Sequence, residues 1–361
     1  MAKKGSILFN FLNFGPKKAN SFIDIFKDID EVFKVQASDL SRVPFFEQKD
    51  IEAILNLRKS NVLDRELELI EKEKINCIDI FDQDYPSLLK EIASPPIVLY
   101  IKGRPQVLNK VLFAIVGTRI PTIYGVTTAE SFAYRLSSLG LVIVSGLARG
   151  IDTAAHKGAI KTGETVAVLG SGLLRVYPRE NKKLAEAIAQ NGALVSEFPL
   201  FTEPLSLNFP RRNRIVSGLS KGILVVEAAA RSGAGITARL AVEQNREVFA
   251  IPGNIDSPLS KGTHALIKEG AKLVECLDDI LEELNIKSEG PEQEKLKPNL
   301  NLCEKKIFEA MNDRKEASLE EIFINCGLEH SIFNKTILEL QLKDLIKEVK
   351  PACFVKSDFM K

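Results

Sequence analysis

The sequence predicts an α/β protein whose core is a parallel sheet, with a small helical module before it and a winged-helix-like segment after it. Beyond Gly103, continuous apolar runs alternate with amphipathic stretches, which is typical of parallel strands covered by helices on both faces. The earlier part shows short helical patterns divided by Gly and Pro. We therefore expect a helical module at 1–66, the core at 67–285, a polar linker at 286–299 and the winged-helix-like domain at 300–361.

In the first segment, apolar residues recur at helical spacing from Phe22 to Ile29. Gly15-Pro16 precedes them and resembles the turn of a helix-hairpin-helix module, whose backbone amides can hold a DNA phosphate. A plain helix start explains the same residues, and we favour it. A charged helix from Glu66 to Glu73 then leads to strands at Cys77–Ile80 and Ile97–Ile101.

Six further strands and the helices between them follow in the core. The expected strands are Leu112–Val116, Leu141–Val144, Thr165–Leu169, Ala193–Ser196, Ile223–Val226 and Glu247–Ile251. The expected helices include Val126–Ser138, Glu180–Gln190 and Ile236–Asn245, with a last one at Leu277–Leu284. Ligands of such sheets bind beyond the carboxyl ends of the strands.

The C-terminal segment has the element order of a winged helix. Three helices are expected, and two short strands follow them; the ranges are Cys303–Met311, Leu319–Asn325, Ser331–Lys343, Ile346–Val349 and Cys353–Val355. The third helix carries Lys335 and Lys343, but Glu339 and Asp344 accompany them. We therefore favour a protein-contact or stability role for this domain over reading of DNA.

Composition limits the possible functions. Lys and Arg number 49 and Asp and Glu 48, so any nucleic-acid site must be a local cluster. Five cysteines never form a CxxC pair, which favours reduced thiols, and we take Cys303, Cys326 and His330 as incidental. No apolar run has the length of a signal sequence core or a membrane span. We expect a cytoplasmic protein with no metal, no cofactor and no membrane contact.

The stretch from Leu141 to Lys161 carries the most distinctive pattern. A buried strand ends at Ser145-Gly146, and a turn with Arg149 follows. Asp152 is then well placed to cap an Ala-rich helix. A glycine turn between a parallel strand and a helix presents free amides and the positive end of the helix dipole. The pattern predicts a site for a phosphate-bearing ligand.

Several other strand ends carry comparable turns. Gly117-Thr118-Arg119, Gly170-Ser171-Gly172, Tyr177–Asn181 and Arg231–Gly235 all follow strands, so they should share one rim of the sheet. A dinucleotide fingerprint is absent, since Arg175 stands where its third glycine should be, and there is no GxxxxGK[ST] loop. The sequence therefore argues against bound NAD, FAD or a P-loop nucleotide.

The densest basic cluster is Phe209-Pro210-Arg211-Arg212-Asn213-Arg214. Its arginines suit phosphates, Asn213 suits a base edge and Phe209 offers a stacking face, which is the composition of a single-strand groove. Alternatively, one or two arginines pair with Glu197, Glu203 or Glu227 and fix the loop, and we expect about half of them to be structural.

His156 lies four residues after Asp152, on the same helix face. A Ser–His–Asp hydrolase using Ser145 is conceivable, but no GxSxG elbow is present. We favour a hydrogen-bonded structural histidine and assign no catalytic residue.

Seven motifs in order resemble the DprA/Smf family of DNA-processing proteins. They are GTR (117–119), SGLARGID (145–152), YPREN (177–181), SEFP (196–199), FPRRNRIVSGLS (209–220), SGAGITARLAVE (232–243) and IPGNIDSPLSKGTHALIKEGA (251–271). The resemblance spans about 79–284 and implies an extended Rossmann-like core, with an N-terminal module similar to SAM or helix-hairpin-helix domains. It implies a cytosolic bacterial homodimer that binds single-stranded DNA, protects incoming strands and loads the RecA recombinase during natural transformation. The family is not known for catalysis.

The resemblance also implies a set of DNA-binding residues. By motif, these are Arg119, Arg149, Arg179, Phe209, Arg211, Arg212, Asn213 and Arg214, with Gly117, Gly146 and Gly233 in the turns. The family's dimer face lies late in the core, which suggests the helix Leu277–Leu284 with Ile280 and Leu284 exposed. Two departures, Thr118 in place of Ser and Gly235 in place of a bulky residue, remove no charge.

Two other function classes stay open. A nucleotide-hydrolysing enzyme of the lysine-decarboxylase-like group, a phosphoribohydrolase, uses a similar core with a PGGxGTxxE motif. Here SGAGITARLAVE lacks the leading Pro-Gly pair and its acid, Glu243, sits later. A pure interaction protein, with the core as a dimer scaffold, would show no affinity for DNA.

Overall fold

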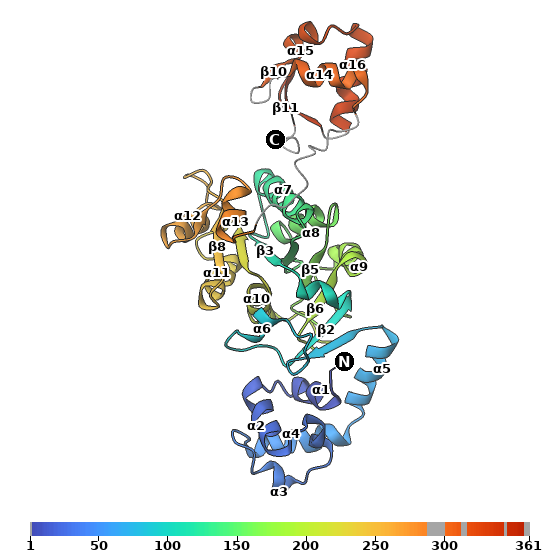
Figure 1. The fold of residues 1–361 in the computed structure, drawn as a ribbon, viewed down its shortest axis with the longest axis vertical. Coiled ribbons are helices and arrows are strands. Elements are labelled where there is room, and N and C mark those ends of the chain that lie inside the picture. The colour runs from blue at the N-terminus through green and yellow to red at the C-terminus, as the bar shows by residue number, and fades with distance from the viewer. Residues whose placement is uncertain (1, 287–299, 312–315, 343–344, 357–361) are drawn as a thin grey trace. The chain divides into compact units, whose positions relative to one another are not determined.

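The structure is a computed structural model that describes residues 2–286, 300–311, 316–342 and 345–356. The chain divides into two compact units, Met1–Lys287 and Ser288–Lys361 (Figure 1). The linker predicted at 286–299 lies, apart from residue 286, outside the described residues. No described helix is both long enough and apolar enough to cross a bilayer.

A nine-stranded sheet forms the centre of the first unit. Its spatial order is β1-β2-β6-β5-β4-β3-β7-β8-β9. The strands are β1 Asn76–Asp79, β2 Val98–Gly103, β3 Leu112–Val116, β4 Val142–Ser145, β5 Thr165–Val168, β6 Ala193–Ser196, β7 Gly222–Val225, β8 Glu247–Ala250 and β9 Lys272–Leu273. All eight strands predicted in this unit are present to within about two residues, and the two-residue β9 was missed.

The sheet changes direction between β3 and β7. From β3 the chain adds β4, β5 and β6 outward on one side, and then returns to add β7, β8 and β9 on the other. Strands β3 to β9 pair in parallel, whereas β2 pairs antiparallel with both β1 and β6. Because helices leave the two sides of this switch point on opposite faces, a crevice opens there at the carboxyl ends of the strands.

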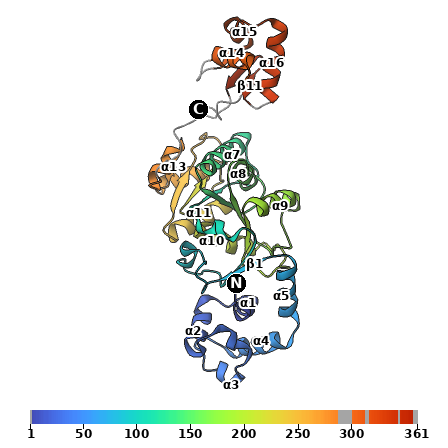
Figure 2. The ribbon, with the colours of Figure 1, turned by 45° about the vertical axis from the view of Figure 1, so that its right-hand side comes forward.

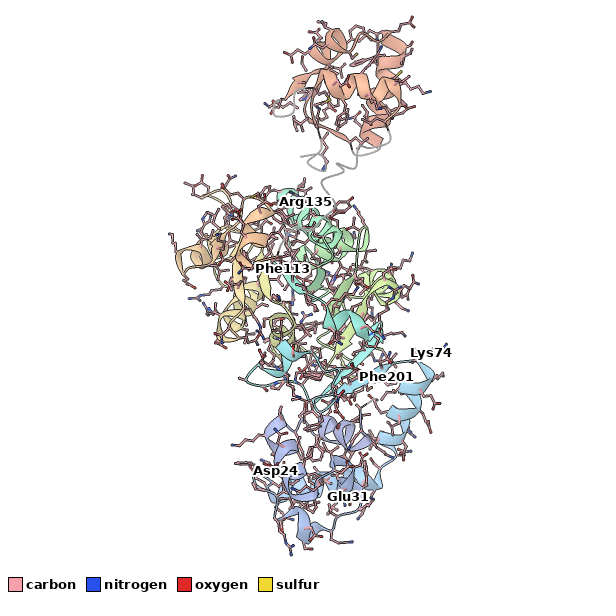
Figure 3. The ribbon with its side chains drawn as sticks, viewed as in Figure 1. Asp24, Glu31, Lys74, Phe113, Arg135 and Phe201 are labelled. Atoms are coloured by element: carbon pink, nitrogen blue, oxygen red, sulfur yellow. The ribbon has the colours of Figure 1, made fainter. Side chains whose placement is uncertain are left out.

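Helices cover both faces, as the continuous apolar strands predict. Alternate residues of β3 point to opposite faces: Ala114 packs in a cluster with α10 (Asn208–Leu219) and α11 (Gly233–Glu243). Phe113 packs with α7 (Ile123–Ser138) and α8 (Ile151–Ile160) on the other face. Figure 2 shows α7, α8 and α9 (Lys182–Asn191) together on one side of the sheet, and Figure 3 labels Phe113 in the interior.

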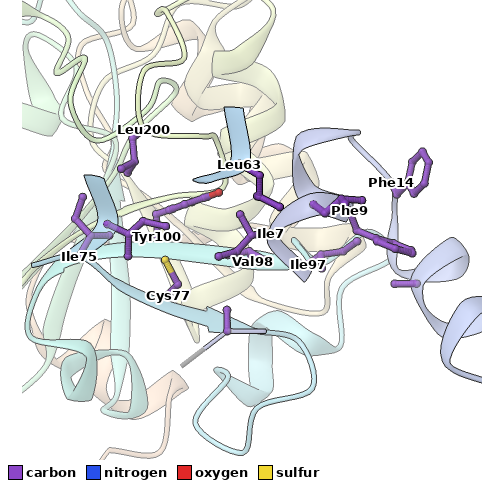
Figure 4. Close-up of a cluster of buried hydrophobic side chains, with 14 of the residues drawn as sticks. Ile7, Phe9, Phe14, Leu63, Ile75, Cys77, Ile97, Val98, Tyr100 and Leu200 are labelled. Carbon is purple, nitrogen blue, oxygen red and sulfur yellow. The ribbon is translucent and has the colours of Figure 1, made fainter. Parts of the chain in front are cut away.

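The N-terminal helices share one hydrophobic cluster with the sheet. They are α1 Lys4–Phe11, α2 Pro16–Phe26, α3 Ala37–Leu40, α4 Gln48–Lys59 and α5 Val62–Lys72. Phe9 of α1 is fully buried and packs edge-on against Phe14 and Phe22, with ring centroids 5.3 and 5.4 Å apart. The same cluster continues into Tyr100 and Leu200 of the core (Figure 4).

Polar contacts reinforce this junction. The Asn10 side-chain amide donates to the Glu197 carbonyl oxygen at 2.9 Å, and the Leu200 N–H donates to the buried Glu66 carboxylate at 2.8 Å. Because α5 begins at Val62, the boundary expected at residue 66 falls inside a helix. Residues 1–66 therefore do not form a compact unit of their own.

Gly15-Pro16 begins α2, with Gly15 as the N-cap and Pro16 as the first helical residue. The two lysines that follow contact the module itself: Lys17 lies 3.7 Å from the Phe45 ring, and Lys18 pairs with Asp50 at 2.6 Å. These contacts agree with the plain helix start that we favoured.

The second unit contains α14 (Leu302–Ala310), β10 (Ala317–Ser318), α15 (Leu319–Cys326), α16 (His330–Leu342), β11 (Ile346–Lys350) and β12 (Cys353–Lys356). Its three strands pair in the order β10-β12-β11. Capping boxes, one of them Ser318–Glu321, start α14 and α15. On α16, Lys335 pairs with Glu339 at 3.8 Å and Leu338 is exposed; Lys343 and Asp344 lie outside the described residues. The winged-helix assignment stays a prediction.

We predict that Phe9→Ala lowers the free energy of unfolding by about 3–5 kcal/mol, because it leaves a cavity in the shared cluster. The matched control is Ile25→Ala on α2, where the side chain is 41% exposed and the loss should stay below about 1 kcal/mol. Denaturant unfolding gives the energies. Hydrogen exchange at β5 should also accelerate in Phe9→Ala, and unchanged exchange there would show that the helices and the sheet unfold separately.

Candidate nucleic-acid interface

An open groove of about 770 Å³ lies at the switch point. We call it the rim groove. Its walls come from the turns after β3 and β4, the turn before α11 and the first turns of α10. The lining residues used below are Gly117, Arg119, Gly146, Asp152, Tyr177, Phe209, Arg212, Asn213, Arg231 and Gly233. The turns that carry Gly117, Gly146, Tyr177 and Arg231 thus meet at one groove, as the sequence predicted, whereas the predicted turn 170–172 does not line it.

The turn after β4 is held by Asp152, although not as a cap. Its carboxylate accepts the N–H groups of Gly146 (3.1 Å) and Ala148 (3.3 Å) within the turn itself. The helix N-cap is Gly150, so the expectation that Asp152 caps α8 is wrong. Gly150 has φ +78°, and a Cβ there would lie 2.4 Å from the Thr118 carbonyl oxygen. Only glycine lets the turns after β3 and β4 approach this closely.

Glu227, which follows β7, holds the turn after β3 in place. The Thr118 N–H donates to the Glu227 carbonyl oxygen at 2.7 Å, and the Thr122 N–H donates to the Glu227 carboxylate at 2.9 Å. Glu227 therefore occupies the amide end of α7. Between these two anchors, Arg119 is exposed, and its guanidinium lies 5.5 Å from the centre of the Phe209 ring.

Phe209 is the aromatic floor of the rim groove. Its ring lies 5.8 Å from that of Tyr177, at an interplanar angle of 51°. A Cβ on Gly170 would come within 2.7 Å of the Phe209 ring, so the turn after β5 needs glycine to admit it. Tyr177 is 44% exposed, and sequence reasoning did not assign it to the site. Its position in the YPREN motif was the sequence signal that could have assigned Tyr177 to the site.

The basic cluster begins a helix, whereas we expected it to form a loop. It occupies the first half of α10, where Pro210 stands in the first turn and costs no helical hydrogen bond. The apolar spacing of Ile215, Val216 and Leu219 was the signal for this helix, since these residues bury against the sheet.

The three arginines of α10 have different roles. Arg212 is buried, and its guanidinium donates to the carbonyl oxygens of Gly146 (2.6 Å) and Val168. Burial lowers the pKa of Arg212 to about 10, so it stays protonated at neutral pH. Arg214 forms an ion pair with Glu197 that is largely buried. Arg211 is exposed and lies 5.4 Å from the Phe198 ring.

The pairing of one cluster arginine with Glu197 is therefore confirmed. Asn213 lines the rim groove, and its side-chain oxygen accepts from Arg212 Nε at 3.2 Å. Arg231 is an exposed cation of the rim groove that sequence reasoning placed in a turn without assigning it to the site.

Besides Arg211 and Arg214, two more predicted cations lie outside the rim groove. Arg149 is exposed and forms a two-pronged ion pair with Glu180, at 2.5 and 2.7 Å. Arg179 lines an adjoining cavity of about 590 Å³. The structure thus brings Arg119, Arg212 and Asn213 together, and leaves Arg149, Arg179, Arg211 and Arg214 away from the rim groove.

His156 is a buried structural residue, as we favoured. The Thr165 hydroxyl donates to the Ile143 carbonyl oxygen at 2.7 Å, so it accepts from Nδ1–H of His156, also at 2.7 Å. Ser145 donates to the Ile115 carbonyl oxygen, which leaves no Ser–His pair. Among the described residues no group of three His, Cys, Asp or Glu side chains suits a metal ion.

The expected exposure of Ile280 is wrong. Ile280 on α13 (Asp278–Glu283) is fully buried, because it packs in the cluster formed by α7, α8 and the sheet. Leu284 is only partly buried against the same cluster. Helical spacing placed these two residues on one face but did not reveal that this face points inward.

A family model described as DNA recombination-mediator protein A matches residues 76–285. The chain belongs to the DprA/Smf family. It is 49% identical to protein Smf of Escherichia coli over 217 residues, which are 60% of this chain but only 58% of that protein. It is 45% identical to the DNA processing protein DprA of Bacillus subtilis over 62% of this chain and 75% of that protein.

Two solved structures of the family share the fold. The X-ray structure of DprA from Streptococcus pneumoniae aligns with TM-score 0.68 at 36% identity, over 78% of this chain and 99% of that one. DprA of Helicobacter pylori, described for its single-stranded DNA binding mode, aligns with TM-score 0.54 at 30% identity, over 59% of this chain and 96% of that one.

In this DprA/Smf chain we predict that Arg212→Ala lowers the free energy of unfolding by about 3–5 kcal/mol. The change leaves two buried carbonyl groups without their hydrogen-bond donor and the Asp152 carboxylate without a nearby positive charge. Arg211→Ala is the matched control, and its loss should stay below about 1 kcal/mol. Denaturant unfolding measures both. Equal losses would mean that Arg212 is not the structural arginine.

The buried histidine gives a pH prediction. Burial, together with the charge of Arg212, lowers the pKa of His156 from 6.5 to about 3. Between these two pH values His156 binds a proton in the unfolded chain but stays neutral in the folded chain. Stability should therefore fall as pH drops from about 6.5 toward about 3, by up to about 1.4 kcal/mol per pH unit.

Burial raises the pKa of the carboxyl groups of Glu66, Asp152 and Glu197. These groups bind protons more readily in the folded chain than in the unfolded chain, so their contribution to stability rises as the pH falls, opposite to that of His156. The measurement is therefore the difference in pH slope between the wild type and His156→Asn. In the variant, the pH dependence of the free energy of unfolding should lack the contribution of the one proton that His156 binds in the unfolded chain. Identical slopes would contradict a neutral buried histidine.

Proposed function

We propose that this protein binds single-stranded DNA in the rim groove, with little sequence preference, and acts as a recombination mediator. The observation that carries the proposal is the juxtaposition of Arg119, Phe209 and Tyr177 at the switch point, in a groove that Arg231 also lines. A cation over an aromatic ring, open to solvent, combines the two contacts that single strands need, to the phosphate and to the base.

The geometry of the rim groove supports this mode of binding. Arg119 and Arg231 neutralise phosphates, and the amides at the start of α11 add hydrogen-bond donors where Gly233 leaves open space. A base stacks on a ring face of the Phe209 and Tyr177 pair. Asn213 is the lining side chain best suited to a base edge, so little sequence is read.

The comparisons support this proposal for the core of the chain. The relatives are named as DNA processing proteins, and the structure from H. pylori is described by its single-stranded DNA binding mode. The rest of the proposal follows from the family resemblance: protection of incoming strands, loading of RecA during natural transformation, a homodimer and a cytoplasmic location. A dimer gives one strand two grooves and therefore avidity. Ile280 cannot contribute to its interface.

Nucleotide hydrolysis is the weaker candidate. Glu243, the acid that the PGGxGTxxE comparison would require, is the last residue of α11, about 15 Å along the helix from Gly233. Among the described residues of the rim groove, Asp152 is the one carboxylate, and backbone N–H groups and Arg212 already engage it. Neither acid is set to act on a ribose in the groove.

The first experiment measures binding of fluorescent oligothymidine, and of duplex of the same length, across a salt series. Preference for the single strand, weakening with salt, is the expected result. Absence of binding, together with release of free base from AMP-type nucleotides, would favour the enzyme; absence of both would favour a pure interaction protein.

Arg119→Ala should weaken single-strand binding on the order of tenfold at moderate salt, equally for different sequences, and reduce the salt slope by about 0.7. The matched control is Arg239→Ala, because Arg239 is exposed on α11 outside the rim groove. An affinity that Arg119→Ala leaves unchanged would mean that the strand binds elsewhere.

A further inference from the structure

A second groove adjoins the rim groove. It measures about 590 Å³, and we call it the α9 groove, after the helix that supplies Lys182 and Glu186 to its wall. Tyr177 and Pro204 line both grooves, so the two grooves meet at this pair of residues. A chain molecule lying in the first groove can therefore extend into the second.

The α9 groove has the chemistry of a polyanion path. Arg179 and Lys182 line it, both are exposed, and neither takes part in an ion pair among the described residues. Two other lining cations are already paired: Lys102 with Glu73 at 3.0 Å and Arg175 with Glu203 at 3.2 Å. The available positive charge therefore lies on the α9 side, next to Tyr177.

Aromatic surface accompanies these cations. Tyr177 stands at the junction with 44% of its surface exposed. Arg175 lies 5.4 Å from the ring of Phe201, which is half exposed and is labelled in Figure 3 on the side of the core that adjoins the N-terminal helices. Phe201 is not among the residues that line the α9 groove, so Tyr177 is the one aromatic side chain of its lining.

Three carboxylates line this groove: Glu73 and Glu203 are paired with Lys102 and Arg175, and Glu186 remains to oppose a polyanion. Glu186 lies one turn after Lys182 on α9, lines the same wall and forms no ion pair with the described residues. It should weaken the binding of phosphates at this wall, and its removal gives a test in the direction of tighter binding.

We infer that a single-stranded nucleic acid bound in the rim groove continues past Tyr177 into the α9 groove, where Lys182 and Arg179 neutralise its next phosphates. The inference rests on the proposed function and extends it, because it sets the direction of the strand and makes affinity depend on length. Short strands fill the rim groove alone, whereas longer ones reach the α9 groove.

The test compares oligothymidine strands from about 4 to about 20 nucleotides on the wild type and three variants. Lys182→Glu should leave the shortest bound strands unaffected, weaken the long ones on the order of fivefold and reduce their salt slope by about 0.7 or more. The matched control is Lys183→Glu, an exposed neighbour on α9 outside the groove lining, with the same change in net charge. Glu186→Gln should tighten long strands about two- to threefold, a gain that misfolding cannot produce.

Equal effects of Lys182→Glu and Lys183→Glu at every length, or no gain from Glu186→Gln, would overturn the inference while short strands still bind. Failure of the wild type to bind strands of any length would overturn the proposed function and this inference with it.

Discussion

The buried guanidinium of Arg212 is the contact on which the site depends. It joins the carbonyl groups at the ends of two neighbouring strands, Gly146 after β4 and Val168 of β5, to helix α10. Strand ends leave carbonyl groups beyond the last ladder bond, and an unpaired buried carbonyl is costly. A Cβ on Gly146 would lie 2.3 Å from the guanidinium, so this position of the arginine requires glycine at residue 146. The groove floor is therefore shaped before any ligand arrives.

Burial divides the cations of α10 and of the rim groove into two kinds. Arg212 and Arg214 are engaged by backbone carbonyls or by a carboxylate, and they hold α10 against the sheet. Arg119 and Arg231 keep their charge in solvent, where it can exchange counterions for phosphates. One contiguous motif, FPRRNR, thus supplies both the frame of the groove and, through Phe209, its stacking surface.

The N-terminal helices are part of the same frame. The segment after β6 is tied to them at Glu197 by Asn10 and at Leu200 by Glu66, and the apolar cluster around Phe9 and Tyr100 runs through the junction. This segment leads directly to Pro204, which lines both grooves. The helices therefore position the loop that joins the rim groove to the α9 groove.

The sequence by itself determined the order of strands and helices, the shared rim of glycine turns and the family. Continuous apolar runs, glycine breaks and ordered motifs are local signals, and local signals suffice for these features. The tertiary structure alone decided which face of a helix points inward, and this buried Ile280. It likewise decided which arginines of α10 donate to carbonyl groups and which are exposed to solvent. It also decided that Asp152 closes a turn and that Tyr177 joins two grooves. These outcomes depend on contacts between segments far apart in the chain, and residue spacing does not record them.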